Sequence, residues 1–223
     1  MLSEYRARLT GALRQTLERA GKLGMLGGSA EIDAQIDHAL GFVQTFESSL
    51  GRPPHSVLDL GSGGGLPGLV LHQAWPETEV VLLEASERRA EFLRSELARS
   101  GAEGSRAAGS VEVVRGRAEG IAHQTRYRGR FEGVSSRSFG APAVVAECGA
   151  PFLANGGILV VSEPPEEDGS SRWPEEGLAE FGLGRGEATR VDDRFNYRVL
   201  PKRRSTPARF PRRDGVPSKR PLF

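Results

Sequence analysis

A glycine-rich segment follows a short apolar run near residue 57. The segment Asp59-Leu60-Gly61-Ser62-Gly63-Gly64-Gly65 comes directly after Val57 and Leu58. Open parallel sheets bind ligands beyond the carboxyl ends of their strands, and glycines there let the backbone approach the ligand. Glu84 ends the next apolar run, 25 residues after Asp59, where a carboxylate can accept hydrogen bonds from both ribose hydroxyls of an adenosine group. The spacing predicts a site for a nucleotide-like ligand.

Three interpretations of the glycines are open. The frame Gly63, Gly65, Gly68 matches the dinucleotide pattern G-x-G-x-x-G, but it starts beyond the predicted strand and contains Pro67. S-adenosylmethionine carries a cationic sulfonium and an ammonium group, which a carboxylate such as Asp59 would favour. A purely structural turn is the third interpretation. The acidic residue before the glycines favours S-adenosylmethionine.

Other patterns of chemical interest are weak. The four histidines are scattered without metal-ligand spacing, and the nearby serines form no hydrolase elbow, so no metal site or nucleophile is predicted; these residues are His38, His55, His72, His123, Ser135, Ser136 and Ser138. Cys148 is the single cysteine, which excludes an intramolecular disulfide and a Cys-rich zinc site. A reducing cytoplasm is the expected compartment.

The pattern of apolar residues predicts the elements that must position this site. Two amphipathic helices are expected over 2–17 and 32–46, separated by residues 24–29. Alternating elements follow. Strands are expected at 57–60, 80–83, 111–114, 133–135 and 158–161, and helices at 66–74, 86–100 (ended by Gly101) and 142–153. Such alternation predicts a single α/β domain whose mostly parallel sheet is covered on both faces.

The C-terminal part has a different composition. Residues 163–176 are expected to form an exposed loop, and 187–191 with 197–200 an antiparallel strand pair that turns near Asp192-Asp193. Nine basic residues and one acidic residue lie between Arg198 and Phe223, which leaves 21 basic and 28 acidic residues upstream. The net charge of +1 therefore hides a basic tail that could bind a polyanion. Its prolines block a helix and predict an extended backbone.

Length and composition agree with one soluble domain. The chain has 223 residues, of which 38% are hydrophobic, enough to bury a full core without disulfides or metals. No apolar run approaches bilayer length, and the N-terminus has no uninterrupted signal-peptide core. We expect no contact with a membrane and a monomer in the cytoplasm.

Four motifs together resemble one enzyme family. They are Val57 to Gly68, Gly116-Arg117-Ala118-Glu119, Ser136-Arg137-Ser138-Phe139, and Thr206 to Pro217. In this order they resemble the bacterial small-subunit (16S) ribosomal RNA guanine-N7 methyltransferases, also known as the glucose-inhibited division protein B family. The resemblance runs from about residue 55 to the C-terminus.

The resemblance implies a fold, a donor and roles for particular residues. It implies a Rossmann-like class I methyltransferase fold with a seven-stranded, mostly parallel sheet and an antiparallel C-terminal pair. The expected division is a helical segment at 1–50, a methyltransferase domain at 51–202 and a basic tail at 203–223. The donor would be S-adenosylmethionine. Its contacts would come from Asp59, Gly61, Gly63, Leu66, Glu84, Ala118, Glu119 and Arg137.

The implied partner is 16S ribosomal RNA or the small ribosomal subunit. Arg137 would lie between donor and RNA as the catalytic residue; alternatively it forms a surface ion pair. RNA contacts are expected from Arg117 and the tail residues Arg209, Arg212, Arg213, Lys219 and Arg220. Guanine N7 carries a lone pair and no proton, so methyl transfer to it needs positioning rather than a general base. Phe139 could stack on the base or belong to the core.

The chain also departs from the family pattern. Ser162-Glu163 stands where the family has lysine and glycine, only part of the histidine-containing helix matches around His38, and residues 24–28 replace an asparagine-led segment. Two alternatives to the RNA enzyme therefore stay open. One is a methyltransferase of the same scaffold that acts on a small molecule or a protein. The other is a non-catalytic assembly factor that binds the donor and RNA.

Overall fold

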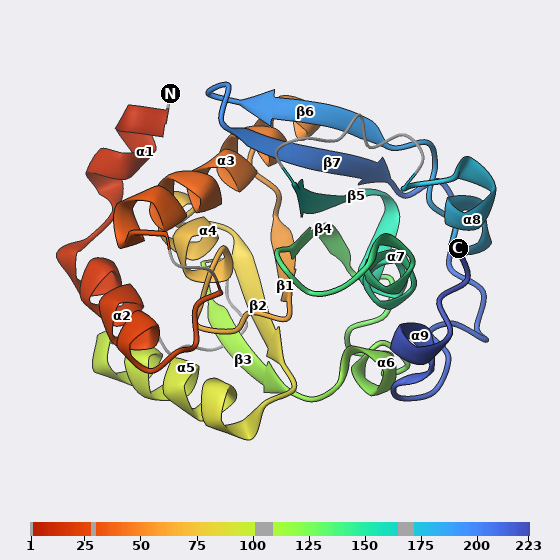
Figure 1. The fold of residues 1–223 in the computed structure, drawn as a ribbon, viewed down its shortest axis with the longest axis horizontal. Helices are drawn as coiled ribbons and strands as arrows, with labels where there is room; N and C mark the ends of the chain where they lie inside the picture. The colour runs from red at the N-terminus through yellow and green to blue at the C-terminus, as the bar shows by residue number, and fades with distance from the viewer. Residues whose placement is uncertain (1, 28–29, 101–108, 165–171) are drawn as a thin grey trace.

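One seven-stranded sheet forms the centre of the computed structural model, with the strand order β3-β2-β1-β4-β5-β7-β6 (Figure 1). The structure describes residues 2–27, 30–100, 109–164 and 172–223. The first five strands are parallel, and β7 is antiparallel to both β5 and β6. The strands are β1 (Ser56–Leu60), β2 (Glu79–Glu84), β3 (Val111–Arg115), β4 (Phe131–Ser136), β5 (Leu153–Glu163), β6 (Glu187–Val191) and β7 (Phe195–Pro201). This topology confirms the predicted fold class.

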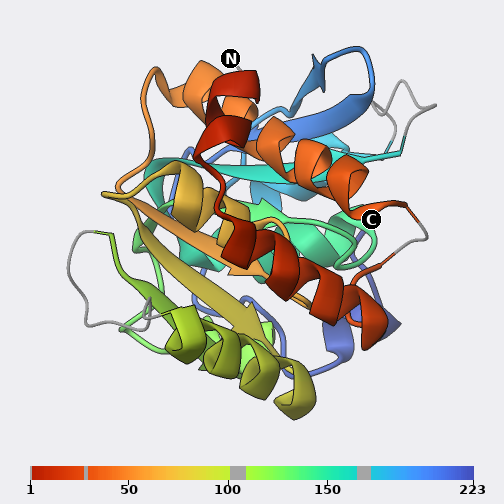
Figure 2. The ribbon, with the colours of Figure 1, turned by 90° about the vertical axis from the view of Figure 1, so that its left-hand side faces the viewer.

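Helices cover both faces of this sheet. One face is covered by α1 (Leu2–Arg8), α2 (Gly11–Lys22), α3 (Ile32–Leu50), α4 (Gly68–Ala74) and α5 (Glu87–Ser100). The other face is covered by α6 (Ala118–Ile121), α7 (Pro142–Gly149), the 3-10 turn η1 (Ala150–Phe152), α8 (Glu175–Glu180) and the C-terminal segment with α9 (Val216–Lys219). Figure 2 shows α3, α2 and α5 lying in that order across the first face.

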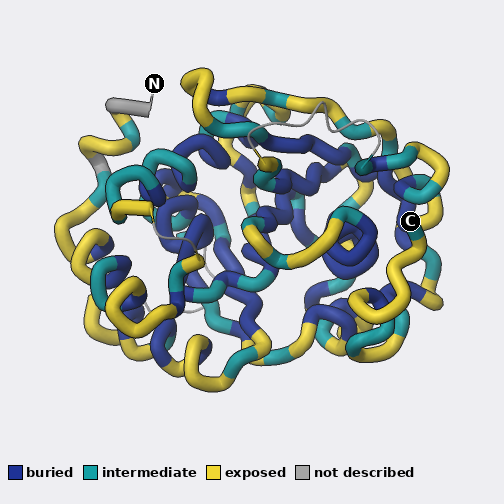
Figure 3. The backbone as a smooth tube through the Cα atoms, viewed as in Figure 1, coloured by how far each residue is buried: buried dark blue, intermediate teal, exposed yellow. Residues whose placement is uncertain are grey.

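Alternation along the strands separates two hydrophobic clusters. Val57 of β1 and Val80 of β2 pack into the cluster under α2 to α5, whereas Leu58 and Val81 pack into the cluster under α6 to α8. Figure 3 shows the central strands mostly as buried and the exposed residues on the outer helices and loops. Because α2 and α3 contribute to the first cluster, the N-terminal helices share a core with the sheet. The division of the chain into three segments stays a prediction.

The winding of the sheet reverses between β1 and β4. The connections from β1 through β3 run along one face, and those from β3 through β5 run along the other. Leu60, the last residue of β1, lies opposite Ser136, the last residue of β4. A reversal of this kind opens a crevice beyond the strand ends, which is where such sheets bind ligands.

Several element boundaries differ from the sequence predictions. The expected N-terminal helix is divided, because Thr10 caps a new helix by accepting a hydrogen bond from Leu13 N at 3.3 Å. The expected helix at 142–153 ends at Gly149, and β5 begins earlier, at Leu153. The C-terminal tail is not wholly extended: Pro217 lies in the first turn of α9, the position where a helix tolerates proline. Gly101 and parts of the expected segments 24–29 and 163–176 lie outside the described residues.

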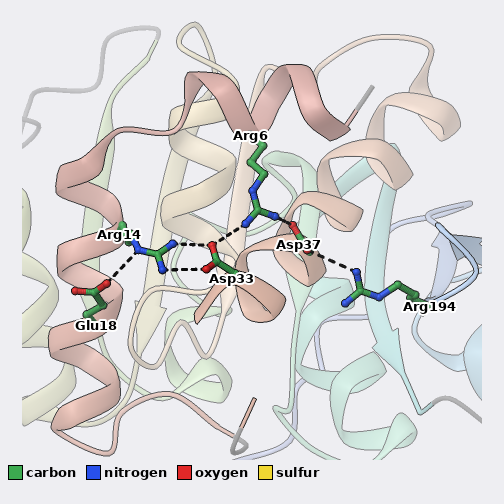
Figure 4. Close-up of polar contacts among 6 residues, drawn as sticks. All are labelled: Arg6, Arg14, Glu18, Asp33, Asp37 and Arg194. Carbon is green, nitrogen blue, oxygen red and sulfur yellow. Dashed lines mark hydrogen bonds and ion pairs between the residues drawn. The ribbon is translucent and has the colours of Figure 1, made fainter. Parts of the chain in front are cut away.

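An exposed ion-pair network joins the N-terminal helices to the rest of the molecule (Figure 4). Asp33 of α3 accepts from Arg14 Nη1 and Nη2 of α2 at 2.6 and 2.9 Å, and from Arg6 of α1 at 2.6 Å. Asp37, one turn later, contacts Arg6 and also Arg194 of the β6–β7 turn, the latter at 3.6 Å. Each exposed pair contributes little alone, so the apolar cluster rather than this network holds the helices in place.

Gly41 lets α3 approach β7 closely. The Tyr197 hydroxyl donates a 2.6 Å hydrogen bond to His38 O, and a methyl group at position 41 would lie 2.1 Å from that hydroxyl oxygen. The Tyr197 ring also packs edge-on against Phe42, with 4.9 Å between centroids. The absence of a side chain at Gly41 is therefore a packing requirement.

We predict that Gly41→Ala lowers the free energy of unfolding by about 1 to 3 kcal/mol, because Tyr197 must be displaced. Gly21→Ala is the matched control. A methyl group there would make ordinary contacts of 3.7 and 3.9 Å with Ile32 and Leu26, and alanine favours a helix over glycine. Denaturant unfolding should show the loss for the first variant only. Equal stability of both variants would contradict this assignment.

Candidate active site

A cleft of about 140 Å³ lies at the reversal point of the sheet. Its floor is the glycine loop after β1, and its walls come from the end of β4, from the start of α5 and from the segment that joins α2 to α3. The lining residues are Met25, Leu26, Gly27, Gln35, Gly61, Ser62, Gly63, Gly64, Leu66, Arg89, Arg137 and Ser138. The predicted residues Gly61, Gly63, Leu66 and Arg137 are thus brought together.

The glycine loop adopts a backbone that favours glycine. Gly61, Gly63 and Gly65 have φ values of 75°, 56° and 107°. Gly61 N donates to Leu83 O at 2.9 Å, and Gly63 N donates to Glu84 Oε2 at 2.9 Å. The end of β2 therefore fixes the loop that follows β1.

Glu84 is buried behind this loop, 6% exposed. Its second oxygen, Oε1, accepts a 2.7 Å hydrogen bond from Ser86 N. The carboxylate thus joins the glycine loop to the start of α5. Glu84 is the last residue of β2, as predicted, but it does not line the cleft, and its contact with a ribose stays a prediction.

Asp59 lies beneath the loop and is 1% exposed. Its Oδ1 accepts from the Ser135 hydroxyl at 2.8 Å and its Oδ2 from Gly68 N at 3.1 Å. Burial raises the pKa of the Asp59 carboxyl to about 6, and these hydrogen bonds oppose the rise. A side chain at Gly68 would lie 2.7 Å from Asp59 Oδ2, so glycine allows α4 to start against this carboxylate.

Arg137 enters the cleft from the end of β4. Its Nη2 donates to Gln35 Oε1 of α3 at 3.1 Å, and Gln35 Nε2 donates to Ala30 O at 2.9 Å. Nη1 of Arg137 is buried and has no hydrogen-bond partner among the described residues. Burial lowers the pKa of this guanidinium. This unpaired N–H can donate a hydrogen bond to an anionic or carbonyl group of a ligand.

The motif after β3 contacts the C-terminal segment. Glu119 is 3% exposed, and its Oε1 accepts from Arg117 Nη2 at 2.8 Å and from Gly215 N at 2.9 Å. Burial alone would raise the pKa of Glu119, but these hydrogen bonds outweigh it and hold the pKa below its ordinary value. Ala118 is buried beside Glu119. The Arg117 side chain is half exposed, and its Nε also lies 3.9 Å from Asp214 Oδ2.

Two of the three departures from the family pattern can be placed in their local surroundings. The Glu163 side chain is only 8% exposed, contacts Arg172 and Trp173, and lies 3.8 Å from Arg198 Nε. Its negative charge is therefore largely neutralised by its neighbours. Ser162 lies opposite Tyr197 in the β5–β7 ladder. His38 stacks on the Tyr197 ring at 5.6 Å, and burial followed by the charge of Arg137 lowers its pKa to about 4.

Five lining residues lie outside every motif that the sequence analysis singled out. Met25, Leu26 and Gly27 precede α3, Gln35 lies on α3 and Arg89 on α5. A methyl group at Gly64 would lie 2.7 Å from Leu26 Cδ2, so this segment lies directly over the glycine loop. The sequence carries no periodic signal for such a contact. Phe139 is half-buried and packs against the second cluster, which agrees with the core alternative.

The described residues contain no group of three or more acidic, histidine or cysteine side chains that could hold a metal. Within the same residues, no helix is long and apolar enough to cross a membrane.

Comparison with known proteins places the chain in a family. The family model described as rRNA small subunit methyltransferase G matches residues 15–165. The chain belongs to this family. A ribosomal RNA small subunit methyltransferase G from Rubrobacter xylanophilus is 37% identical, and the match covers 77% of this chain and 66% of that protein. The protein of the same name from Deinococcus radiodurans is 31% identical, and the match covers 99% of this chain and 85% of that protein. This membership confirms the resemblance seen in the four motifs.

Solved structures with the same fold are more distant in sequence. An O-methyltransferase from Bacillus cereus, solved in complex with SAH, has a TM-score of 0.58 at 17% identity over 86% of this chain and 90% of its own. The SAH-bound methyltransferase PaMTH1 from Podospora anserina also has a TM-score of 0.58, at 15% identity over 88% and 89%. These similarities confirm the class I methyltransferase fold predicted from the sequence.

The raised pKa of Asp59 gives a testable dependence of stability on pH. The native state holds the Asp59 proton more tightly than the unfolded chain, so its stabilising contribution is present below about pH 4 and is lost as the pH rises through about 6. A shift of this size corresponds to about 3 kcal/mol. We expect the free energy of unfolding of Asp59→Asn, relative to that of the wild type, to rise by up to this amount between pH 4 and pH 7.

The measurement is urea unfolding of both proteins at several pH values. Asp214→Asn, which changes an exposed carboxylate, is the control and should follow the wild-type profile. Parallel profiles for Asp59→Asn and the wild type would show that Asp59 is ionised normally in the folded protein.

Proposed function

We propose that the protein transfers a methyl group from S-adenosylmethionine to N7 of a guanine in small-subunit (16S) ribosomal RNA. The observation that carries the proposal is the glycine loop at the reversal point of the sheet, with two buried carboxylates behind it and Arg137 beside it, in a chain of this family. We also infer that the protein acts as a monomer in the cytoplasm and without a metal.

Residues that line the cleft, together with residues buried behind it, would hold the proposed donor. S-adenosylmethionine supplies an activated methyl group on a positively charged sulfur. Gly61, Gly63 and Leu66 would border its methionine and ribose parts, and the Glu84 carboxylate would accept from the ribose hydroxyls. Ala118 and Glu119 would lie at its adenine edge. The negative charge of Asp59, set behind the loop, favours a cationic ligand over a pyrophosphate, which argues against a dinucleotide.

The reaction needs little acid–base chemistry from the protein. Guanine N7 holds a lone pair and no proton, so no side chain has to remove one. The task of the site is to align the acceptor nitrogen with the methyl group, and orientation of this kind can lower a barrier by about 7 to 11 kcal/mol. We assign this positioning to Arg137, which lines the cleft and has an unpaired, buried Nη1, with Gln35 fixing its orientation.

RNA contacts would come from Arg117 and from the basic residues of the C-terminal segment. These side chains would bind phosphates and contribute affinity without selecting a sequence. The buried, paired state of Glu163 removes one reason to expect a different acceptor, because its charge does not oppose RNA at the open face.

We predict that Glu84→Ala weakens binding of S-adenosylhomocysteine by about 1 to 3 kcal/mol, since both the loop anchor and the proposed ribose acceptors are lost. Glu91→Ala, which removes an exposed carboxylate on α5, is the matched control and should leave the affinity unchanged. Isothermal titration calorimetry measures both. Wild-type affinity in Glu84→Ala would exclude Glu84 from the donor site.

The function is tested by mapping methylated nucleotides in ribosomal RNA from cells with and without the gene. We expect one N7-methylguanosine of the small-subunit RNA to disappear on deletion. The wild-type gene should restore it, and Arg137→Ala, still folded and able to bind S-adenosylhomocysteine, should not. An unchanged map would refute the RNA reaction. Donor-dependent labelling of a metabolite or protein extract would then separate the small-molecule or protein alternative from the non-catalytic one.

A further inference from the structure

A second concavity, of about 660 Å³, lies on the C-terminal segment. It shares no lining residue with the glycine-loop cleft. Five basic side chains and one acidic side chain line it, together with Gly215 and Val216: Arg209, Arg212, Arg213, Lys219, Arg220 and Asp214. Cations gathered in one concave surface raise the local concentration of anionic ligands.

The segment that forms this concavity is folded against the domain. Arg128 donates from Nη1 to Phe210 O at 2.9 Å and from Nη2 to Thr206 O at 2.9 Å. His123 Nε2 lies 2.8 Å from Pro211 O. Phe210 is buried, 4% exposed, and its ring packs edge-on against Phe181. The basic residues therefore lie on a backbone that is folded against the domain, and not on a free, extended tail.

Two buried carboxylates hold the middle of the segment. Glu147 of α7 is 1% exposed and accepts from Arg212 N, Nε and Nη2 at 2.8, 2.9 and 2.7 Å. Glu119 of α6 accepts from Gly215 N at 2.9 Å. Residues 212 to 215 are thus fixed at both ends. Figure 1 shows α9, which begins at the next residue, beside α6 and α7.

Some of the cations remain available to a ligand. Among the described residues, the side chains of Arg213 and Lys219 make no hydrogen bond or ion pair, and both are exposed. Arg209 contacts Glu180 at 2.9 Å, but both partners are more than half exposed, so a phosphate can replace the carboxylate at little cost. Unpaired like charges repel one another, and a bound anion relieves that repulsion.

We propose that this concavity is a preorganised site for phosphodiester groups of the RNA substrate, with Glu147 and Glu119 as its positioning residues. The inference rests on the proposed function, because it takes RNA as the acceptor. The site lies beside α6, which follows closely after β3. An RNA strand bound there would therefore lie at the edge of the sheet formed by the carboxyl ends of the parallel strands, where the cleft also lies. Glu119 connects the concavity to the donor site, because it belongs to the motif assigned to the donor and also accepts a hydrogen bond from Gly215 N.

The test compares variants in binding to a small-subunit ribosomal RNA transcript over a range of KCl concentrations. Arg213→Ala with Lys219→Ala should weaken binding at every concentration and reduce the slope of log affinity against log salt by roughly 1 to 2. Arg99→Ala with Arg185→Ala removes two exposed cations outside the concavity and should retain the wild-type slope. Both variants should bind S-adenosylhomocysteine as the wild type does.

Glu147→Gln tests the positioning role. It leaves every cation in place but removes the charge that fixes Arg212, so we expect weaker RNA binding with unchanged affinity for S-adenosylhomocysteine. A merely structural role would lower the melting temperature without changing the salt slope of RNA binding. Wild-type slopes in both the double variant and Glu147→Gln would overturn the phosphate site and leave the proposed function intact. The phosphate site would also be overturned if the double variant lost binding to phosphatidylglycerol vesicles but kept wild-type binding to RNA. Failure of the wild type to bind RNA would refute both proposals.

Discussion

The buried carboxylate of Asp59 joins three elements at the point where the winding of the sheet reverses. It extends from β1, accepts a hydrogen bond from Ser135 of β4 and another from the Gly68 amide at the start of α4. A carboxylate in this position is costly to ionise, as its raised pKa shows. The glycine loop lies directly above it, so the geometry of the cleft depends on this group.

The same arrangement recurs at the other acidic residues that organise the open edge. Glu84, Glu119 and Glu147 are all nearly buried, and each accepts a hydrogen bond from the backbone of a loop: Gly63, Gly215 and Arg212, respectively. Loops carry unpaired amide donors, and a buried carboxylate satisfies them more strongly than a neutral acceptor does. Part of the excess of acidic residues in the body of the chain therefore serves to fix its loops, including the basic C-terminal segment.

The sequence predicted the fold and the glycine loop that borders the cleft, because both depend on local patterns. The strand at 57–60 followed by glycines, and Glu84 at the end of the next strand, require only periodicity and spacing along a short stretch. Gln35, Met25 and Leu26 escaped prediction, because they reach the cleft through packing of α2 and α3 against a distant loop. The C-terminal segment was predicted to be extended, yet contacts with Arg128, Glu147 and Glu119 fold it and allow a short helix at Val216–Lys219.

The sequence by itself determined the alternation of strands and helices, the glycine loop with its two carboxylates, and the concentration of positive charge near the C-terminus. These are properties of neighbouring residues, and hydrophobic periodicity and side-chain chemistry specify them without reference to the rest of the chain. Only the tertiary structure decided that Arg137 is oriented by Gln35, and that the basic residues form a concave surface. Those outcomes depend on contacts between residues about one hundred positions apart, or between the tail and α6 and α7, which follow from close packing of the completed core.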